Sequence, residues 1–336
     1  MATTAPAMKT KKMSMHEALN QALREELSRD EKVVILGEEV GLYNGVHYVT
    51  RGLYQEFGKD RVIDTPISEE SFVGVGVGMA IMGFRPVVEM MRMDFSLRAM
   101  DQIYNHMAKI HYMSGGHLKV PMVLRGPEGP GPNPGLTAQH GQQLTALFAH
   151  CPGLRVVTPA TQHDAKGMLK AAIRSDDPVV FLEPGPLNNK QGEVGEGDYL
   201  VPLDRADTKR EGDDITLIGY GASVALCLQA ARELERDGLS AAVIDMRCLR
   251  PLDMQPALAS VAKTGRALIV EYAWQSYGPG AEIVARLMQD AFWDLDAPVG
   301  RVSGKETPLP YAANLEELSK PQLDEIVAKA KEIAAA

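Results

Sequence analysis

The chain has 336 residues, of which 45% are hydrophobic and 24% charged, as is usual in a soluble globular protein. This length is enough for two domains, each with its own core. The formal net charge of -9 argues against nucleic acid as a main partner, because binding phosphates requires a basic surface. The longest apolar run, residues 72–83, is broken by glycines and too short to span a bilayer, so we expect no membrane contact. Three scattered cysteines without a Cys-x-x-Cys pair suit a reducing compartment, and we expect a cytoplasmic protein.

Residues 1–12 carry lysines without the hydrophobic segment of a signal peptide, and we expect a disordered tail there. From residue 13 onward, helix and strand signals alternate, which predicts an α/β fold with largely parallel sheets. A first domain is predicted over residues 13–183. Its expected elements are helix 14–30, strands 33–36 and 85–90, helix 97–113, strands 120–125 and 155–158, helix 164–175 and strand 178–182.

Residues 184–213 are rich in Pro, Gly, Asn and charge, which predicts an interdomain linker. A second α/β domain is predicted over residues 214–336. Its expected elements are strand 214–221, helix 224–237, strands 241–245 and 267–271, helix 280–292 and helix 315–336. The last helix is charged and amphipathic, so we expect it to present a solvated face.

Residues 62–78 place a carboxylate, Glu69, between an apolar run and a stretch punctuated by glycines. An ionisable group is rarely set in such a place for packing, and general acid or base chemistry uses carboxyl groups in apolar surroundings. The alternative is a helix cap, since Ser68 or Glu69 could cap a helix that begins near Ser71. These residues alone do not separate the two interpretations.

The glycines Gly74, Gly76 and Gly78 invite comparison with the dinucleotide-binding pattern Gly-x-Gly-x-x-Gly. The third glycine of that pattern is missing because Met79 stands in its place. Glu89 comes too early to be the acidic residue that ends the next strand. Small residues four apart instead allow another helix to approach closely, so we expect a subunit interface at this segment.

His140 lies in a polar segment that follows a strand ending at Arg125 and the glycine- and proline-rich loop 126–135. Polar residues on a loop at the carboxyl end of a strand belong where α/β proteins bind ligands. A solvent-facing histidine at the start of a helix is equally compatible with this pattern.

A set of motifs spread over the whole chain resembles the beta subunits of thiamine-diphosphate-dependent 2-oxo acid dehydrogenases. In chain order they are Ile63-Asp-Thr-Pro-Ile-Ser-Glu69, Met93-Asp-Phe95, Asp101-Gln-Ile103, Tyr112-Met-Ser-Gly-Gly116, Arg125-Gly-Pro127, Gln139-His140, His150-Cys-Pro-Gly-Leu154, Asp245-Met-Arg-Cys-Leu-Arg-Pro-Leu-Asp253 and Gly278-Pro-Gly-Ala-Glu-Ile283. The resemblance runs from Met13 to about Ala330 and implies two transketolase-like domains, of which the first binds the pyrimidine of the cofactor. Residues 112–116 and 125–127 look most like the members that act on pyruvate. Branched-chain 2-oxo acid and acetoin enzymes are close alternatives.

The resemblance implies a specific role for Glu69. In this family the matching carboxyl group bonds to N1′ of the aminopyrimidine ring and favours the imino tautomer, whose neighbouring nitrogen takes the proton from thiazolium C2. The cofactor then accepts the electrons left when the 2-oxo acid loses CO2. Phe95 matches an aromatic residue that stacks on the pyrimidine, and Ile67 and Met91 match its apolar surroundings. His140 matches a histidine that lines the channel and assists acyl transfer to lipoamide.

The chain is expected to hold only half of the cofactor site. The wider enzyme class binds Mg2+ and the diphosphate through Gly-Asp-Gly followed at a distance by Asn. Gly212-Asp213-Asp214 and Gly197-Asp198 both fail this pattern. An alpha subunit would therefore supply Mg2+ and the diphosphate site, and the resemblance implies an α2β2 heterotetramer on a dihydrolipoyl acyltransferase core with its lipoyl domain. A non-catalytic assembly subunit is the alternative of another class, against which the retained Glu69, Phe95 and His140 argue.

The resemblance also implies a structural potassium ion held by backbone carbonyls. The matching positions are Met122, Ala172, Ile173, Ser175 and Asp177. Because the ligands are main-chain oxygens, the serine at position 175, where Asp is common, need not abolish the site.

The chain departs from the family pattern near both proposed catalytic residues. Glu70 stands next to Glu69, where an uncharged residue is usual, and its role stays open. The loop 129–135 is longer than usual, and Gly141 replaces a common serine after His140. These changes leave the choice of substrate and the shape of the channel open, though not the cofactor.

Overall fold

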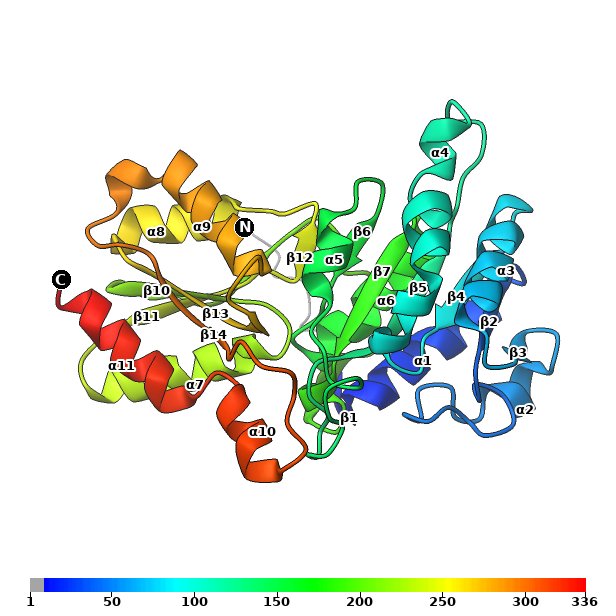
Figure 1. Ribbon diagram of the computed structural model, residues 1–336, viewed down its shortest axis with the longest axis horizontal. Coiled ribbons are helices and arrows are strands. Elements are labelled where there is room, and N and C mark those ends of the chain that lie inside the picture. Colours follow the sequence, from blue (N-terminus) through cyan, green and yellow to red (C-terminus); the bar gives the residue numbers. More distant parts are fainter. Residues whose placement is uncertain (1–8) are drawn as a thin grey trace, which may run out of the picture.

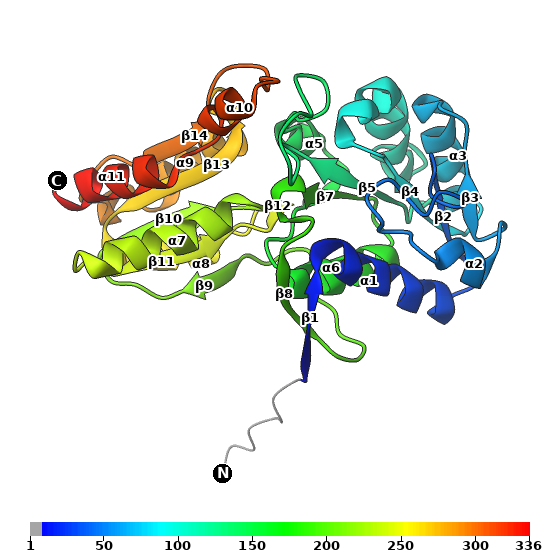
Figure 2. The same cartoon turned by 90° about the horizontal axis from the view of Figure 1, so that it is seen from below.

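Figure 1 shows the computed structural model of the chain, which describes residues 9–336. Two α/β units lie side by side, each built on a sheet flanked by helices (Figures 1 and 2). The predicted α/β class is therefore confirmed. Within residues 9–336, none of the helices combines the length and the apolar character needed to cross a membrane.

The first unit has a seven-stranded sheet in which every pair is parallel except the one at the β12 edge. In pairing order the strands are β12 (Cys248–Arg250), β6 (Arg155–Val157), β7 (Val179–Pro184), β5 (Val123–Glu128), β4 (Arg85–Glu89), β2 (Val33–Gly37) and β3 (Val62–Asp64). Its helices are α1 (Met15–Arg29), α2 (Leu53–Phe57), α3 (Glu69–Ile81), α4 (Ile110–Met113), α5 (Thr145–His150) and α6 (Gln162–Arg174).

The second unit has a five-stranded sheet in which only β9 runs antiparallel to its neighbour. In pairing order its strands are β14 (Gly300–Gly304), β13 (Ala267–Trp274), β10 (Ile215–Gly219), β11 (Ala241–Asp245) and β9 (Asp207–Arg210). Its helices are α7 (Ser223–Arg236), α8 (Gln255–Thr264), α9 (Pro279–Asp290), α10 (Ala313–Ser319) and α11 (Leu323–Ala334).

Alternate residues of each strand contribute to different hydrophobic cores, because successive side chains of a strand point to opposite faces. In β2, Val33 and Ile35 face the core under α1 and α6, whereas Val34 and Leu36 face the other side. That second core continues into the second unit, where it includes Ile218 of β10. The two units therefore share buried apolar surface.

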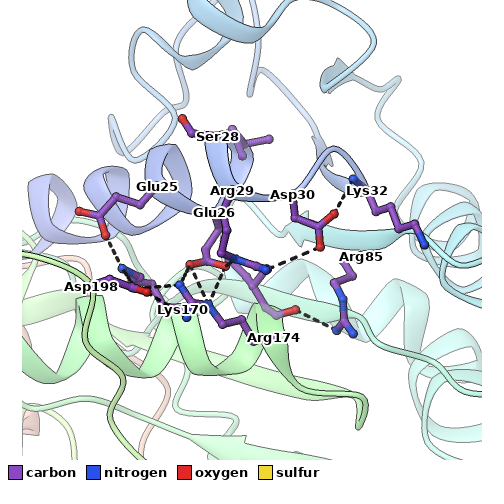
Figure 3. Close-up of polar contacts among 12 residues, drawn as sticks. Glu25, Glu26, Ser28, Arg29, Asp30, Lys32, Arg85, Lys170, Arg174 and Asp198 are labelled. Carbon is purple, nitrogen blue, oxygen red and sulfur yellow. Dashed lines mark hydrogen bonds and ion pairs between the residues drawn. The ribbon is translucent and has the colours of Figure 1, made fainter.

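A network of charges, from fully buried Glu26 to exposed Asp198, joins α1 to α6 (Figure 3). Glu26, which is fully buried, accepts hydrogen bonds from Arg174. Asp198 pairs with both Arg174 and Lys170, and Glu25 pairs with Lys170. A buried carboxylate is costly unless it is paired, so this network holds α1, α6 and the segment around Asp198 in one arrangement.

The structure corrects the predicted domain limits at both ends of the first domain. Residues 10–12, predicted as disordered, belong to β1 (Thr10–Ser14), which pairs antiparallel with β8 (Gln191–Gly195); residues 1–8 of that tail lie outside the described residues. The linker predicted over 184–213 contains β8 and β9, and the longest stretch in it without helix or strand is residues 196–206. Such strands escape sequence patterns because pairing with a distant segment, rather than an apolar face, stabilises them.

Two predicted helices are also interrupted. The helix predicted over 97–113 is replaced by a 3-10 helix (Met93–Ala99), a π-helix (Gln102–Met107) and α4. Here the Ser96 hydroxyl donates to the Met93 carbonyl at 2.6 Å and competes with the helical backbone pattern. The helix predicted over 315–336 is broken into α10 and α11 at Pro321, because proline forces the preceding Lys320 into an extended conformation.

The glycines of α3 have three different surroundings. A Cβ at Gly76 would lie 2.7 Å from Val88 of β4, so this glycine lets the helix pack on its own sheet. A Cβ at Gly74 would lie 3.1 Å from Gln102, whereas one at Gly78 would meet nothing within 4 Å. The close approach predicted for this segment is thus internal at Gly76, and only the Gly78 side remains open to another chain.

A cluster of charges at the boundary of the two units includes one carboxyl group without a hydrogen-bond partner. Lys209 of β9 lies 2.6 Å from Asp164 of α6 and 3.5 Å from Asp245 at the end of β11. Neither carboxylate oxygen of Asp245 accepts a hydrogen bond, and the residue is fully buried. Burial raises the pKa of Asp245 to about 7, although Lys209 acts in the opposite direction.

We predict that Asp245→Asn raises the free energy of unfolding at pH 8 and that the gain shrinks toward pH 5. The unfolded Asp releases its proton near pH 4, whereas folded Asp245 retains it up to about pH 7. Between these values the native protein loses about 1.4 kcal/mol per pH unit relative to the unfolded chain. Urea unfolding of the full chain at both pH values measures this, with exposed Asp294→Asn as the control. A variant less stable than the wild type at pH 8 would show that Lys209 instead stabilises a charged Asp245.

Candidate functional site

The residues of the candidate site lie after the carboxyl ends of four neighbouring parallel strands. Glu38 follows β2, residues 65–69 follow β3, residues 90–95 follow β4 and residues 129–140 follow β5. Because the carboxyl ends of parallel strands meet at one edge of the sheet, these segments share that edge. It is the edge at which open α/β sheets place their ligands.

Glu69 is the first residue of α3 and is partly exposed. Ser68 occupies the N-cap position of α3, but its side chain makes no capping hydrogen bond to the helix backbone. Its hydroxyl donates instead to the Ser71 hydroxyl at 2.8 Å. Beside Glu69, the apolar side chain of Ile67 is 84% exposed. A partly exposed carboxylate next to an exposed apolar side chain leaves room for a ligand or a partner chain at this position.

Glu38 is a second carboxyl group of this region, and the sequence interpretation missed it. The residue is buried, and its Oε1 has no hydrogen-bond partner. Burial raises the pKa of Glu38, and the negative charges of Glu69 and Glu39 raise it further. The signal in the sequence was Gly37-Glu38-Glu39 directly after an apolar strand. The next residue, Glu39, has a φ of 59°, which is uncommon for a residue other than glycine.

The structure brings Phe95 and His140 together. Phe95 lies in the 3-10 helix after β4, and His140 lies on the long loop after β5. Their rings meet edge to face, with centroids 5.3 Å apart and planes inclined at 84°. This is a favourable geometry for an aromatic pair. The two rings, separated by 45 positions in the chain, therefore form one wall of the site.

Met91, the other predicted apolar neighbour, is partly buried on the segment between β4 and the 3-10 helix. Next to its backbone lies His47, a residue that the sequence interpretation did not single out. Burial lowers the pKa of His47 to about 4, and the positive charges of Arg92 and Arg125 act in the same direction. The imidazole of His47 is therefore neutral at physiological pH.

A buried arginine connects three strands directly beneath this edge. Arg125 of β5 is fully buried and pairs with Glu89 of β4 and with Glu183 of β7. Burial by itself disfavours the charged guanidinium, but the two carboxylates outweigh it and raise the pKa of Arg125. Removal of one carboxylate would leave an uncompensated buried charge.

The same strand carries a carboxyl group that is protonated at neutral pH. Burial raises the pKa of Glu128 to about 8, although hydrogen bonds from Thr145 and the Leu144 backbone lower it. Thr145 and Gln143 both donate to Oε1, at 2.7 and 2.6 Å, and Oε2 has no partner. Glu128 also escaped the sequence interpretation, since a Glu in a glycine-rich loop resembles a surface residue.

The carbonyls predicted to hold potassium lie at the opposite, amino-terminal edge of the sheet. The Arg85 guanidinium donates through one nitrogen to the carbonyls of Ile173 and Ser175, at 3.1 and 2.8 Å. The carbonyls of Met122 and Ala172 accept from backbone N–H groups of Val179 and Ser175. At least two predicted ligands, those of Ile173 and Ser175, therefore converge on one positive charge, and each carbonyl keeps a second lone pair.

The chemistry available at the carboxyl-terminal edge is that of carboxyl groups and aromatic rings. Within residues 9–336 no group of three or more His, Cys, Asp or Glu side chains is placed to hold a metal ion. Glu69 and Glu38 can share protons with a weakly basic ring, and Phe95 can pack against such a ring. The arrangement suits half of the binding site of an aromatic, nitrogen-containing cofactor.

Comparison with family models also divides the chain into two parts. The model described as "Transketolase, pyrimidine binding domain" matches residues 11–190, and the model described as "Transketolase, C-terminal domain" matches residues 204–326. A solved structure named "Split gene transketolase, inactive beta4 tetramer" shares the fold with a TM-score of 0.78 at 22% identity, over 96% of this chain and 98% of that one. The predicted architecture of two transketolase-like domains is confirmed.

Curated relatives are similar over almost the whole chain. The "Pyruvate dehydrogenase E1 component subunit beta, mitochondrial" of Dictyostelium discoideum is 46% identical, over 96% of this chain and 92% of its own. The human protein of the same name is also 46% identical, over 96% and 90%. The "Pyruvate dehydrogenase E1 component subunit beta" of Rhizobium meliloti is 46% identical, over 96% and 70%. This chain belongs to the transketolase-like family of pyruvate dehydrogenase E1 component beta subunits.

Proposed function

We propose that the chain acts with an alpha subunit in oxidative decarboxylation of pyruvate and transfer of the acetyl group to lipoyl groups, which the whole complex uses to form acetyl-CoA. The single observation that carries this proposal is the shared strand edge, which holds Glu69 together with the Phe95–His140 ring pair. The relatives named as subunits of pyruvate dehydrogenase favour pyruvate over branched-chain 2-oxo acids and acetoin.

Thiamine diphosphate, when bound, supplies the electron sink for decarboxylation. Glu69 would share a proton with N1′ of the aminopyrimidine. Burial raises the pKa of Glu38, and the negative charge of Glu69 raises it further, so the two carboxyl groups influence each other's charge. Phe95, Ile67 and Met91 provide the apolar surroundings of the ring. His140, which contacts Phe95, assists acyl transfer to the lipoyl group. These roles argue against a non-catalytic assembly subunit.

The open face around Glu69 supports a partner chain that supplies the diphosphate and Mg2+ sites. Large apolar side chains are exposed beside Glu69 and along α3 and α4 of the first domain, and exposed apolar surface of this kind marks interaction sites. They are Ile67, Val75, Met82, Tyr112 and Met113, which are between 55% and 88% exposed. The proposed assembly is an α2β2 heterotetramer docked on a dihydrolipoyl acyltransferase core, in the cytoplasm, where the three buried and unpaired cysteines would stay reduced.

The first prediction from this proposal concerns Glu69. Glu69→Gln in the co-expressed tetramer should lower pyruvate decarboxylation at least about 100-fold, because the amide cannot share a proton with N1′. Exposed Glu70→Gln is the matched control and should keep near-normal turnover. Gel filtration should show the same assembly for both variants. The assay compares pyruvate with branched-chain 2-oxo acids, and near-normal turnover by Glu69→Gln would rule out the mechanism.

The second prediction concerns the cofactor. The isolated chain should bind thiamine diphosphate weakly or not at all, because the described residues offer Glu69 and apolar contacts but no metal-binding carboxylate cluster. Isothermal titration calorimetry with Mg2+ present measures this, and the co-expressed tetramer serves as the positive control. Tight, Mg2+-dependent binding to the chain alone would refute the half-site.

The third prediction concerns potassium at the carbonyls of Met122, Ala172, Ile173, Ser175 and Asp177. An ion bound there should raise the midpoint of thermal unfolding in KCl above that in NaCl at equal ionic strength, because a ligand of the native state stabilises it. The carbonyls of Ile173 and Ser175 accept from the Arg85 guanidinium, so a potassium ion would have to share these oxygens with that positive charge. Equal midpoints in the two salts would show that the Arg85 guanidinium already satisfies these carbonyls.

A further inference from the structure

The loop that carries His140 is fastened to the first domain at its two ends. The Arg92 guanidinium donates to the Gly129 carbonyl at 2.5 Å, and Arg92 is itself buried beside Asp94. At the other end, the backbone N–H of Gln142 donates to the Asp94 carboxylate at 3.0 Å. These contacts fix residues 129 and 142 but leave the stretch between them to be held by other means.

Two further contacts come from the second domain. The backbone N–H of Gly135 donates to Glu316 Oε2 of α10 at 2.8 Å. Gly141 faces Leu309 so closely that a Cβ at position 141 would lie 2.1 Å from Leu309 Cδ2. In Figure 2, α10 and the segment before it lie beside this loop, between the two units. The segment that includes His140 therefore lies between two contacts from residues more than 160 positions away.

Glu316 is held in place by burial and by an ion pair. Its side chain is fully buried, and Lys320 lies 3.3 Å away as its ion-pair partner. Burial of a carboxylate is costly, so its hydrogen bond to Gly135 contributes to its stability. The segment before α10 is itself held, because the Trp274 indole donates to the Thr307 carbonyl at 3.0 Å.

His140 depends on these contacts because its own connections to the protein are few. Its backbone N–H donates to the Thr137 carbonyl at 3.2 Å in a turn where Thr137 has a φ of 66°. A threonine in this left-handed conformation is strained unless its surroundings hold it. Otherwise the imidazole has the edge-to-face contact with Phe95. Loss of the contact of Gly135 with Glu316, or of Gly141 with Leu309, would allow the turn at Thr137 to relax and the His140 imidazole to shift.

We infer that Glu316 and Leu309 are positioning residues, which hold the loop 129–143 from the second domain and so place His140 for acyl transfer. The inference rests on the proposed function for the role of His140, although the contacts themselves do not depend on it. It also gives a physical reason for glycine at position 141, since a larger side chain would collide with Leu309.

Hydrogen–deuterium exchange on the full chain tests the contacts directly. Glu316→Ala should speed exchange of the Gly135 amide at least about 10-fold, because an unprotected amide loses its native-state hydrogen bond. Glu316→Gln retains an acceptor oxygen and should restore slow exchange. Glu317→Ala, on the same helix with a side chain 65% exposed, is the matched control. Unchanged exchange in Glu316→Ala overturns the inference, whether or not the chain is an enzyme.

Kinetics of the co-expressed tetramer test the role of His140. Glu316→Ala and Leu309→Ala should lower acetyl transfer to a lipoyl domain about 10-fold, because small displacements of a catalytic group are costly. Decarboxylation measured with an artificial electron acceptor should stay within about 2-fold, because Glu69 and Phe95 lie on other segments. Gly141→Ala should show the transfer defect, and Gly141→Ala combined with Leu309→Ala should recover most of the activity.

Equal loss in both assays would mean that the two residues are merely structural and would overturn the positioning role. A wild-type tetramer without 2-oxo acid activity would instead refute the proposed function while leaving the exchange result valid.

Discussion

The buried charge of Arg125 is the constraint on which the rest of the site depends. A guanidinium without contact with water requires negative partners, and Glu89 and Glu183 supply them from the strands on either side. The pairing fixes β4, β5 and β7 relative to one another where these strands end. The segments that carry Glu38, Glu69, Phe95 and His140 leave the sheet at that edge. Burial lowers the pKa of His47, and the positive charges of Arg92 and Arg125 lower it further, so the ion cluster influences the electrostatics of the site as well as its geometry.

The two domains are not independent. β12, from the second half of the chain, pairs with β6 of the first sheet, and one hydrophobic core contains residues of both units. Lys209, Arg247 and Asp164 form an ionic contact across the same boundary. Glu316 and Leu309 of the second domain also contact the loop that carries His140, at the edge where the candidate site lies. The second domain therefore takes part in the site that the first domain carries.

Much of the fold could be predicted because the strands of parallel sheets are continuous apolar runs. β2, β4, β7, β10 and β11 lie where the pattern predicted them, and so do α1, α6 and α7, whereas β5 begins and ends three residues later than predicted. The errors have physical reasons. β1 and β8 are mostly polar and exist because they pair with each other. The C-terminal helix breaks because the residue before a proline disfavours the helical conformation, and Pro321 follows Lys320. The amphipathic pattern continues across this break and therefore does not reveal it.

The motifs around Glu69, Phe95 and His140 were readable in the sequence because each is a local arrangement of residue types. The strand order placed these segments along one edge, and the contact between the Phe95 and His140 rings joins residues far apart in the chain. Glu38, His47 and Glu128 were missed in the sequence, because burial and the charges of distant residues shift their pKa values. A sequence lists ionisable groups, but desolvation and neighbouring charges are properties of packing, and packing is decided by the tertiary structure.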